Sequence, residues 1–420
     1  MLQSPLGALR WATLAFAILG GVAQDWPRFR GPGGRGHGGS VALPDSPTRE
    51  TFNWRVGLPG GGNSSPVVWG ARVFVTCYDA DGSRCLLVCL ATEDGSTLWT
   101  RSLGIQSYGM HDLNSYASVT PAVDSTTVVM AWTSGKMLMS AAFDHDGKKL
   151  WQLPLGRSTA DHGGGSSPTL FDGVALIANL TEGRSDSFLT GLDARTGEVL
   201  WKHPRATSRA SFATPLVYAP DEGPPEAIFS STSHGLTGIA PRTGKLIWEQ
   251  ADLFKPRCVA SPALGGQILF ATAGSGGGGK VGVALNLARR TEAGVPERQY
   301  VLRQGLPYVP SPLATSERLY LWSDGGIVSC LNLESGEEIW RERVGGTFYG
   351  SPILADGKLF AISMSGELVW VRESDEFELL GRLDLEEASN STPAVARGIL
   401  YLRTETHLIS MGQAAPPSGD

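Results

Sequence analysis

The sequence is poor in charged residues, and no long stretch of it is basic. Asp, Glu, Lys and Arg together make up 18% of the 420 residues, and 41 acidic residues outnumber 35 basic ones. Without a basic run to follow a phosphate backbone, nucleic acid is not expected as a partner. Hydrophobic residues make up 41% of the chain. This composition argues against a disordered or coiled-coil protein and favours a globular one with a sizeable core.

Hydrophobic runs long enough to cross a bilayer are also missing. The apolar run of 13 residues from Trp11 to Ala23 is shorter than the ~20 residues that a membrane helix needs. It follows a stretch with one basic residue, Arg10, and ends with small residues at the −3 and −1 positions of a cleavage site. The pattern predicts a signal peptide over residues 1–23 and export to the periplasm or beyond. A membrane span at this segment is the alternative.

The spacing of the five cysteines fits no zinc motif, because they form no C-x-x-C pair and the sequence has no paired histidine cluster. We therefore expect no metal site. A hairpin centred on Asp81 places Cys77 opposite Cys85, which permits a disulfide between them. Cys89, Cys258 and Cys330 are expected to be free buried thiols.

Two motifs of catalytic sites are incomplete. Gly274–Lys280 has the spacing of a phosphate-binding loop, but Val281 stands where Ser or Thr is required and no helix pattern follows. His162–Gly165 resembles the oxyanion loop of hydrolases, but the sequence contains no G-x-S-x-G motif to supply a nucleophile. We interpret both segments as glycine-rich loops.

Glycine and proline, by contrast, are abundant, with 54 and 26 copies. A hydroxyl residue, then Pro, then an apolar β-prone run recurs at intervals that match the size of a four-stranded propeller blade. Each Pro marks the start of a strand, because Pro cannot sit inside a central one. The repeats begin at Ser65-Pro66, Thr120-Pro121, Ser167-Pro168, Thr214-Pro215, Ser261-Pro262, Ser311-Pro312, Ser351-Pro352 and Thr392-Pro393.

A second signal, a turn Gly followed four residues later by Trp, recurs in five of these repeats. A further Trp strand at residues 52–56 has no hydroxyl-Pro strand before it, whereas the last strands, expected at residues 399–403 and 407–411, have no Trp strand after them. We therefore predict an all-β, eight-bladed β-propeller of four-stranded blades, closed by pairing the N-terminal strand with the C-terminal blade. A tandem pair of smaller β domains is the alternative. The tryptophans expected to dock between blades are Trp54, Trp99, Trp151, Trp201, Trp248 and Trp340.

The expected organisation has four parts. A signal peptide over residues 1–23 precedes an N-terminal extension over 24–50. The propeller follows over residues 51–411, and a disordered tail over 412–420 ends the chain.

Loops that precede the inner strands of a propeller converge on one mouth of its central channel, which is the natural binding site of this fold. Here they carry polar and aromatic residues suited to an anionic or hydroxyl-rich ligand. The alternative is that these side chains satisfy backbone groups of their loops. His111 and His162 form a candidate acid–base pair, and metal ligation is the less favoured alternative for them. The candidate ligand-binding residues are Asn63, His111, Asn114, Tyr116, His162, Arg209, Arg257, Tyr308, Tyr349 and Asn390.

Residues 91–99, 192–201 and 331–340 resemble the tryptophan-docking repeat of the PQQ-like, or quinoprotein-type, β-propellers. The opening Asp25–Pro32 looks like the start of an exported, BamB-like subgroup. The resemblance implies a propeller and two branches of function. One branch contains dehydrogenases that bind pyrroloquinoline quinone (PQQ) with calcium, and the other contains non-catalytic members such as the BamB lipoprotein of the outer-membrane assembly machine.

The chain departs from both branches. It has no adjacent Cys-Cys pair, which the resembled dehydrogenases carry against the quinone, and no cysteine near residue 24 for a lipid anchor. We expect an exported, monomeric, non-catalytic binding or scaffold protein without a cofactor, with a protein partner or a small ligand at the channel mouth. The alternative is a PQQ-dependent dehydrogenase of alcohols or sugars. A hydrolase or lyase that uses His111 and His162 is a third hypothesis.

Overall fold

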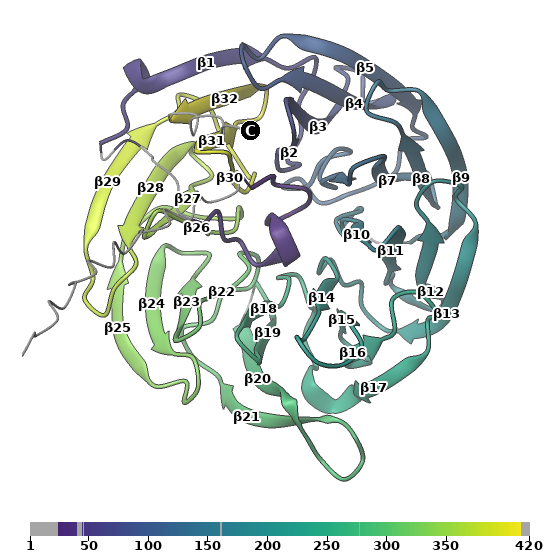
Figure 1. Ribbon diagram of the computed structural model, residues 1–420, viewed down its shortest axis with the longest axis vertical. Helices are drawn as coiled ribbons and strands as arrows, with labels where there is room; N and C mark the ends of the chain where they lie inside the picture. The colour runs from purple at the N-terminus through teal and green to yellow at the C-terminus, as the bar shows by residue number, and fades with distance from the viewer. Residues whose placement is uncertain (1–23, 40–43, 45, 160–161, 277, 413–420) are drawn as a thin grey trace, which may run out of the picture.

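The fold is a ring of eight four-stranded antiparallel sheets around a central channel (Figure 1). The computed structural model describes residues 24–39, 44, 46–159, 162–276 and 278–412. The eight-bladed β-propeller predicted from the repeats is thereby confirmed. The predicted signal peptide and all but the first residue of the predicted tail lie outside the described residues. Within the described part of the chain, no helix combines the length and hydrophobicity needed to cross a membrane.

In seven blades the strands follow one another in sequence from the channel to the rim. Blade 1 has β2 (Val67–Trp69), β3 (Arg72–Tyr78), β4 (Arg84–Ala91) and β5 (Thr97–Gly104), and blade 2 has β6 (Ala122–Val123), β7 (Val128–Ser134), β8 (Met137–Phe143) and β9 (Lys149–Arg157). Blade 3 has β10 (Thr169–Phe171), β11 (Val174–Asn179), β12 (Gly183–Asp193) and β13 (Val199–Thr207), and blade 4 has β14 (Leu216–Tyr218), β15 (Glu226–Ser231), β16 (Gly235–Ile239) and β17 (Leu246–Gln250).

The second half of the ring repeats this order. Blade 5 has β18 (Ala263–Gly265), β19 (Ile268–Ser275), β20 (Gly278–Arg290) and β21 (Pro296–Leu302), and blade 6 has β22 (Leu313–Ala314), β23 (Arg318–Trp322), β24 (Ile327–Asn332) and β25 (Glu338–Arg343). Blade 7 has β26 (Ile353–Ala355), β27 (Lys358–Ile362), β28 (Glu367–Arg372) and β29 (Leu379–Asp384). Short 3₁₀ turns, η1 (Pro32–Gly34), η2 (Arg49–Thr51) and η3 (Ala251–Leu253), lie between strands or ahead of them.

Blade 8 closes the ring in the predicted way. It contains β30 (Ala394–Ala396), β31 (Ile399–Arg403) and β32 (His407–Gly412), and its outermost strand is β1 (Phe52–Gly57) from the N-terminal side of the chain. β1 pairs antiparallel with β32, so that Trp54 lies opposite Ser410. This pairing joins the two ends of the propeller and covers what would otherwise be a free sheet edge.

Most outer-strand aromatic residues dock on a turn of the following blade. The Trp201 Nε1–H donates to the Pro241 carbonyl at 2.7 Å, and its ring lies against Gly244. That glycine has φ of 68°, and a Cβ there would lie 2.5 Å from Trp201 Cγ. The recurring Gly thus leaves room for the Trp of the preceding blade. The equivalent hydrogen bonds join Trp54 to Thr92, Trp99 to His145, Trp151 to Ala194, Tyr300 to Leu333 and Trp340 to Ser374.

Trp248 departs from this pattern. Its Nε1–H donates to Glu226 Oε2 of its own blade at 2.5 Å. Glu226 also accepts from Arg290 of blade 5 at 2.6 Å, and the Arg290 guanidinium lies 5.8 Å from the Trp248 ring centroid. An ion pair and a cation–π contact therefore join blades 4 and 5, whereas five other junctions use a glycine turn that contacts the aromatic ring.

The hydroxyl residues that precede the eight prolines form a closed ring of hydrogen bonds, which we call the hydroxyl ring. Each backbone N–H donates to the side-chain oxygen of the corresponding residue in the next blade, at 2.9–3.3 Å. The recurring hydroxyl thereby satisfies a buried N–H that belongs to no strand pair. The members of the hydroxyl ring are Ser65, Thr120, Ser167, Thr214, Ser261, Ser311, Ser351 and Thr392.

Residues 24–39 form a strap across the centre of the ring (Figure 1). Trp26 exchanges two backbone hydrogen bonds with Val68 of blade 1, at 2.9 and 2.8 Å, and the Gly38 N–H donates to Leu354 of blade 7. Between these points, Arg28 and Arg30 donate to the carbonyls of Pro215 and Pro312 in blades 4 and 6. The strap therefore connects inner strands on different sides of the channel.

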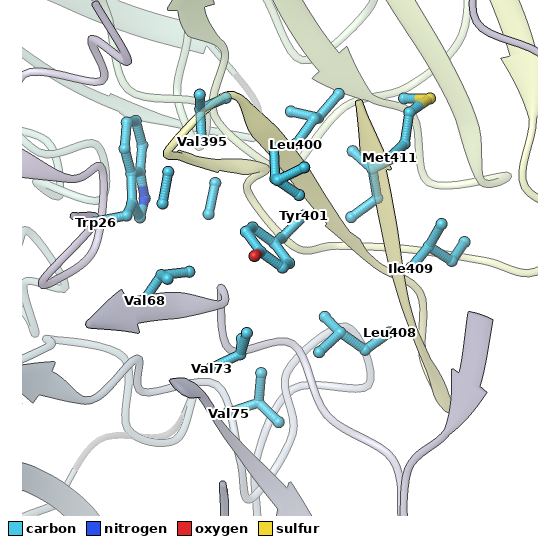
Figure 2. Close-up of a cluster of buried hydrophobic side chains, with 14 of the residues drawn as sticks. Trp26, Val68, Val73, Val75, Val395, Leu400, Tyr401, Leu408, Ile409 and Met411 are labelled. Carbon is cyan, nitrogen blue, oxygen red and sulfur yellow. The ribbon is translucent and has the colours of Figure 1, made fainter. Parts of the chain in front are cut away.

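The strap also enters the hydrophobic core between blades 8 and 1. Figure 2 shows the Trp26 ring beside Val68 and Val395, with Tyr401 on the side of blade 8. Trp26 has no exposed surface, and Val68 and Val395 are at most 1% exposed. The N-terminal segment is thus a structural part of the junction at which the propeller closes.

The predicted disulfide between Cys77 and Cys85 is wrong. In the β3–β4 hairpin Cys77 pairs with Leu86, and Tyr78 pairs with Cys85. This register differs by one residue from a turn centred on Asp81, and a shift of one residue moves a side chain to the other face of the sheet. The two thiols accordingly lie in different core clusters, and all five cysteines are free and buried.

We expect the native protein to be inert toward a thiol reagent such as DTNB. Burial raises the pKa of Cys85 and of Cys89 to about 12 and that of Cys330 to about 11, so little reactive thiolate forms at pH 8. All five thiols should react once urea unfolds the chain. A Ser96→Cys variant, with its new thiol at an exposed position, should react in the folded state and serves as the control. Fast labelling of the folded wild type would contradict this prediction.

Candidate functional site

A cavity of about 750 Å³ lies at one mouth of the channel. Its walls are the loops that precede the inner strands, and both the hydroxyl ring and Phe29 of the strap line it. The structure brings eight of the ten predicted residues to this cavity. These are Asn63, His111, Asn114, His162, Arg257, Tyr308, Tyr349 and Asn390.

Tyr116 and Arg209 are not among the lining residues. The Tyr116 ring packs edge-on against Tyr108, with centroids 5.1 Å apart, and its hydroxyl donates to the Tyr108 carbonyl at 3.2 Å. Its position in a loop turned against Tyr78 explains why it points away from the mouth. Arg209 is exposed to solvent outside the cavity.

His111 and His162 meet as expected for side chains ahead of consecutive inner strands. Their rings are stacked, with centroids 5.3 Å apart and an interplanar angle of 28°. His111 Nδ1 accepts the Leu113 N–H at 3.2 Å, which leaves its proton on Nε2. His162 Nε2 lies 2.8 Å from Arg257 Nη1 and must accept, because a guanidinium has no acceptor. The two imidazoles can thus present N–H donors.

The charged groups at the mouth occur in pairs. Arg257 pairs with Glu182 as well as contacting His162. Lys280 Nζ lies 2.8 Å from Asp324 Oδ2, and Asp324 also accepts the N–H groups of Tyr308 and Val309, each at 2.9 Å. The Asp324 carboxylate therefore fixes the loop that carries Tyr308.

Sequence reasoning missed Lys280, Asp324 and Phe29. Lys280 lies on β20 just after the β19–β20 turn, and Asp324 lies in the β23–β24 turn. The strand order could have indicated both residues. In an antiparallel blade, the turn between the second and third strands lies at the same end as the loop that precedes the first strand, so both reach the channel mouth. Phe29 had no comparable signal, since it comes from the strap.

Asn390 has an unsatisfied acceptor. Its side-chain Oδ1 is buried and has no hydrogen-bond partner among the described residues, although the residue lines the cavity. A buried amide oxygen without a donor is costly. A donor on a bound molecule would satisfy it.

The donor set differs from that expected for a quinone held with calcium. Among the residues that the structure describes, no three His, Cys, Asp or Glu side chains are grouped in a way that could hold a metal. Asp324, the carboxylate that lines the cavity, is occupied by Lys280 and two backbone N–H groups. None of the cysteines lines the cavity.

Sequence comparisons relate the chain to known proteins. The family described as outer membrane protein assembly factor BamB matches residues 46–165, 157–298 and 301–405. BamB of Yersinia pestis is 21% identical over 324 residues, which cover 73% of this chain and 75% of that protein. Protein FAM234A of Rattus norvegicus is 35% identical over 97 residues, a match that spans 17% of its length and 22% of this chain.

Solved structures show the same fold. The crystal structure of BamB from Moraxella catarrhalis aligns with a TM-score of 0.62 and 15% identity, covering 86% of this chain and 96% of that one. A europium-containing methanol dehydrogenase aligns with a TM-score of 0.51 and 10% identity, covering 83% and 89%. At these identities the likeness concerns the fold alone. The family match over most of the chain, together with the propeller and its tryptophan-docking repeats, shows that the chain belongs to the BamB family of PQQ-like β-propellers.

Proposed function

We propose that this protein is an exported, non-catalytic binding propeller whose ligand occupies the cavity at the channel mouth. The observation that carries the proposal is the cavity itself. Its volume of about 750 Å³ is typical of a small-molecule site, and it combines aromatic, amide, imidazole and cationic side chains. The unsatisfied Asn390 Oδ1 supports a ligand with a hydrogen-bond donor. Membership of the BamB family is consistent with a binding scaffold in general.

PQQ with calcium fits these residues poorly. Calcium prefers several carboxylate and carbonyl oxygens, whereas Asp324 already has three donors. The cysteines are free and buried, and none of them lines the cavity. We therefore propose that the cavity takes a different small molecule.

The test uses the purified chain from Gln24 onward. Thermal shift and calorimetry would be run with PQQ plus calcium and with a panel of monosaccharides and small carboxylic acids. We expect saturable binding of at least one panel member, and at least tenfold weaker binding to Asn390→Ala. The matched control is Asn53→Ala, whose side chain bonds to Ser410 and Gly412 on the outer strands, and which should bind as the wild type does.

Two outcomes would contradict the proposal. Saturable binding of PQQ with turnover of an alcohol would favour the dehydrogenase. No binding by any panel member would remove the small-ligand site and leave a protein partner as the alternative. Export is tested separately, by the mass and location of the mature protein in the source cell.

A further inference from the structure

We propose that the hydroxyl ring binds an oxyanion group, such as a carboxylate, sulfate or phosphate, at the deep end of the cavity, and that the buried strap arginines behind the lining supply the positive charge that favours it. This inference rests on the proposed ligand cavity and names the chemistry of the group that enters it. Two independent features support it, namely unused hydroxyl donors on residues that line the cavity and two buried cations next to those residues.

The hydroxyl ring is a circle of donors without acceptors. Each of its side-chain oxygens already accepts a backbone N–H, so what remains to be satisfied is its own O–H proton. Among the described residues, none of these eight protons is donated to a protein acceptor. All eight residues line the cavity, and each is at most 6% exposed. Buried donors without acceptors are costly, and oxygen atoms in the channel would relieve that cost.

Buried positive charge lies next to this circle. The Arg28 and Arg30 side chains reach the carbonyls of Pro215 and Pro312, the residues that directly follow two ring members, at 2.5 and 2.6 Å. Both arginines are at most 5% exposed, and the hydrogen bonds of their side chains to described residues go to backbone carbonyls, which carry no net charge. Arg28 Nε, Arg30 Nε and Arg30 Nη1 have no acceptor among the described residues.

These guanidinium groups remain charged in neutral solution. Burial, with repulsion from Arg30 as a smaller cause, lowers the pKa of Arg28 to about 9, and burial lowers that of Arg30 to about 9. A buried cation without a counter-ion is unfavourable, so an anion nearby lowers the free energy of the site. The pairs Arg257–Glu182 and Lys280–Asp324 near the mouth largely balance their own charges. The excess positive charge therefore belongs to the strap.

Water is the competing occupant of the ring. Water oxygens can accept all eight protons, but they supply no net charge to the arginines. A site filled by water responds to total ionic strength, whereas a true anion site distinguishes sulfate or a carboxylate from chloride. The experiment therefore compares oxyanions with chloride at constant ionic strength.

The test titrates the full mature chain with sodium sulfate, phosphate, acetate and chloride at constant ionic strength and pH. We expect saturable binding, with a rise in melting temperature, for at least one of the oxyanions and none for chloride; which oxyanion saturates identifies the ligand group. Arg30→Gln, which keeps a donor but loses the charge, should weaken that binding at least tenfold. Arg195→Gln, at an exposed turn of blade 3, should leave it unchanged.

A second measurement does not depend on a variant that folds. Crystals grown with sodium selenate, a sulfate analogue with an anomalous signal, should show the anion inside the hydroxyl ring. Equal responses to chloride and oxyanions, or selenate bound only elsewhere, would overturn the inference. If oxyanions fail while a panel ligand still binds in an Asn390-dependent manner, the proposed function stands and this inference alone falls.

Discussion

Trp26→Ala should lower the free energy of unfolding by about 3–5 kcal/mol, the usual cost of removing a large buried aromatic side chain. The Trp26 ring has no exposed surface and packs in the core that joins blades 8 and 1 (Figure 2). It also lies against Gly31, where a Cβ would be 2.5 Å from the ring. Its Nε1–H has no described partner, so the loss comes from packing and the cavity left behind. Urea unfolding followed by circular dichroism measures it.

The control for this prediction is Trp69→Ala. Trp69 lies on β2, one residue after the Val68 that pairs with Trp26, but its side chain is only partly buried. Trp69→Ala should lower the free energy of unfolding clearly less than Trp26→Ala does. Equal losses of stability in the two variants would show that packing of Trp26 between blades 8 and 1 does not stabilise the propeller beyond an ordinary, partly buried tryptophan. Trp26→Phe should recover a large part of the loss because it refills most of the cavity.

Gly244→Ala should lower the free energy of unfolding by about 2–5 kcal/mol. The backbone at Gly244 has φ of 68°, which an L-residue adopts at a cost of about 1–2 kcal/mol. A new Cβ would also lie 2.5 Å from Trp201 Cγ, so the docked ring must shift, and such overpacking costs about 1–3 kcal/mol. The thermal melt should fall accordingly, and the near-ultraviolet spectrum should report the displaced tryptophan.

Gly173→Ala separates the two contributions. Gly173 has φ of 73° in the β10–β11 turn, but a Cβ there meets no atom within 4 Å. The Gly173→Ala variant therefore has only the cost of the backbone conformation, and its free energy of unfolding should fall by about 1–2 kcal/mol. If the two variants lose the same stability, contact between the turn and Trp201 does not constrain the residue at position 244.

The fold was predictable because its signals repeat. A hydroxyl-Pro pair at every inner strand and a Gly-to-Trp spacing at most outer strands reveal the blades even where single copies decay, as at Tyr300. The same repeats predicted that β1 would complete blade 8. The register of the β3–β4 hairpin was not predictable. Whether Cys85 or Leu86 lies opposite Cys77 depends on the conformation of the turn between the strands, which the strand pattern does not fix.

The site was predicted in part, for a related physical reason. His111, His162 and Asn390 each precede an inner strand, so topology alone places them at the mouth. Phe29, and the strap arginines buried behind the cavity lining, come from a segment outside the repeats, where no period exists to place them. The hydroxyl residues were recognised as markers of strands, but their role as mutual hydrogen-bond partners needs the closed ring and is invisible in a single repeat.

The closed ring of hydrogen bonds has an electrostatic consequence. Every N–H in it points in the same rotational sense, from one blade to the next, and the last returns to Ser65. Dipoles joined head to tail in a line add up, as in a helix. In a circle their tangential components cancel, so the ring contributes no net dipole of its own in its plane. Around the channel the ring therefore favours no side, and the unbalanced full charges next to it are those of the strap arginines.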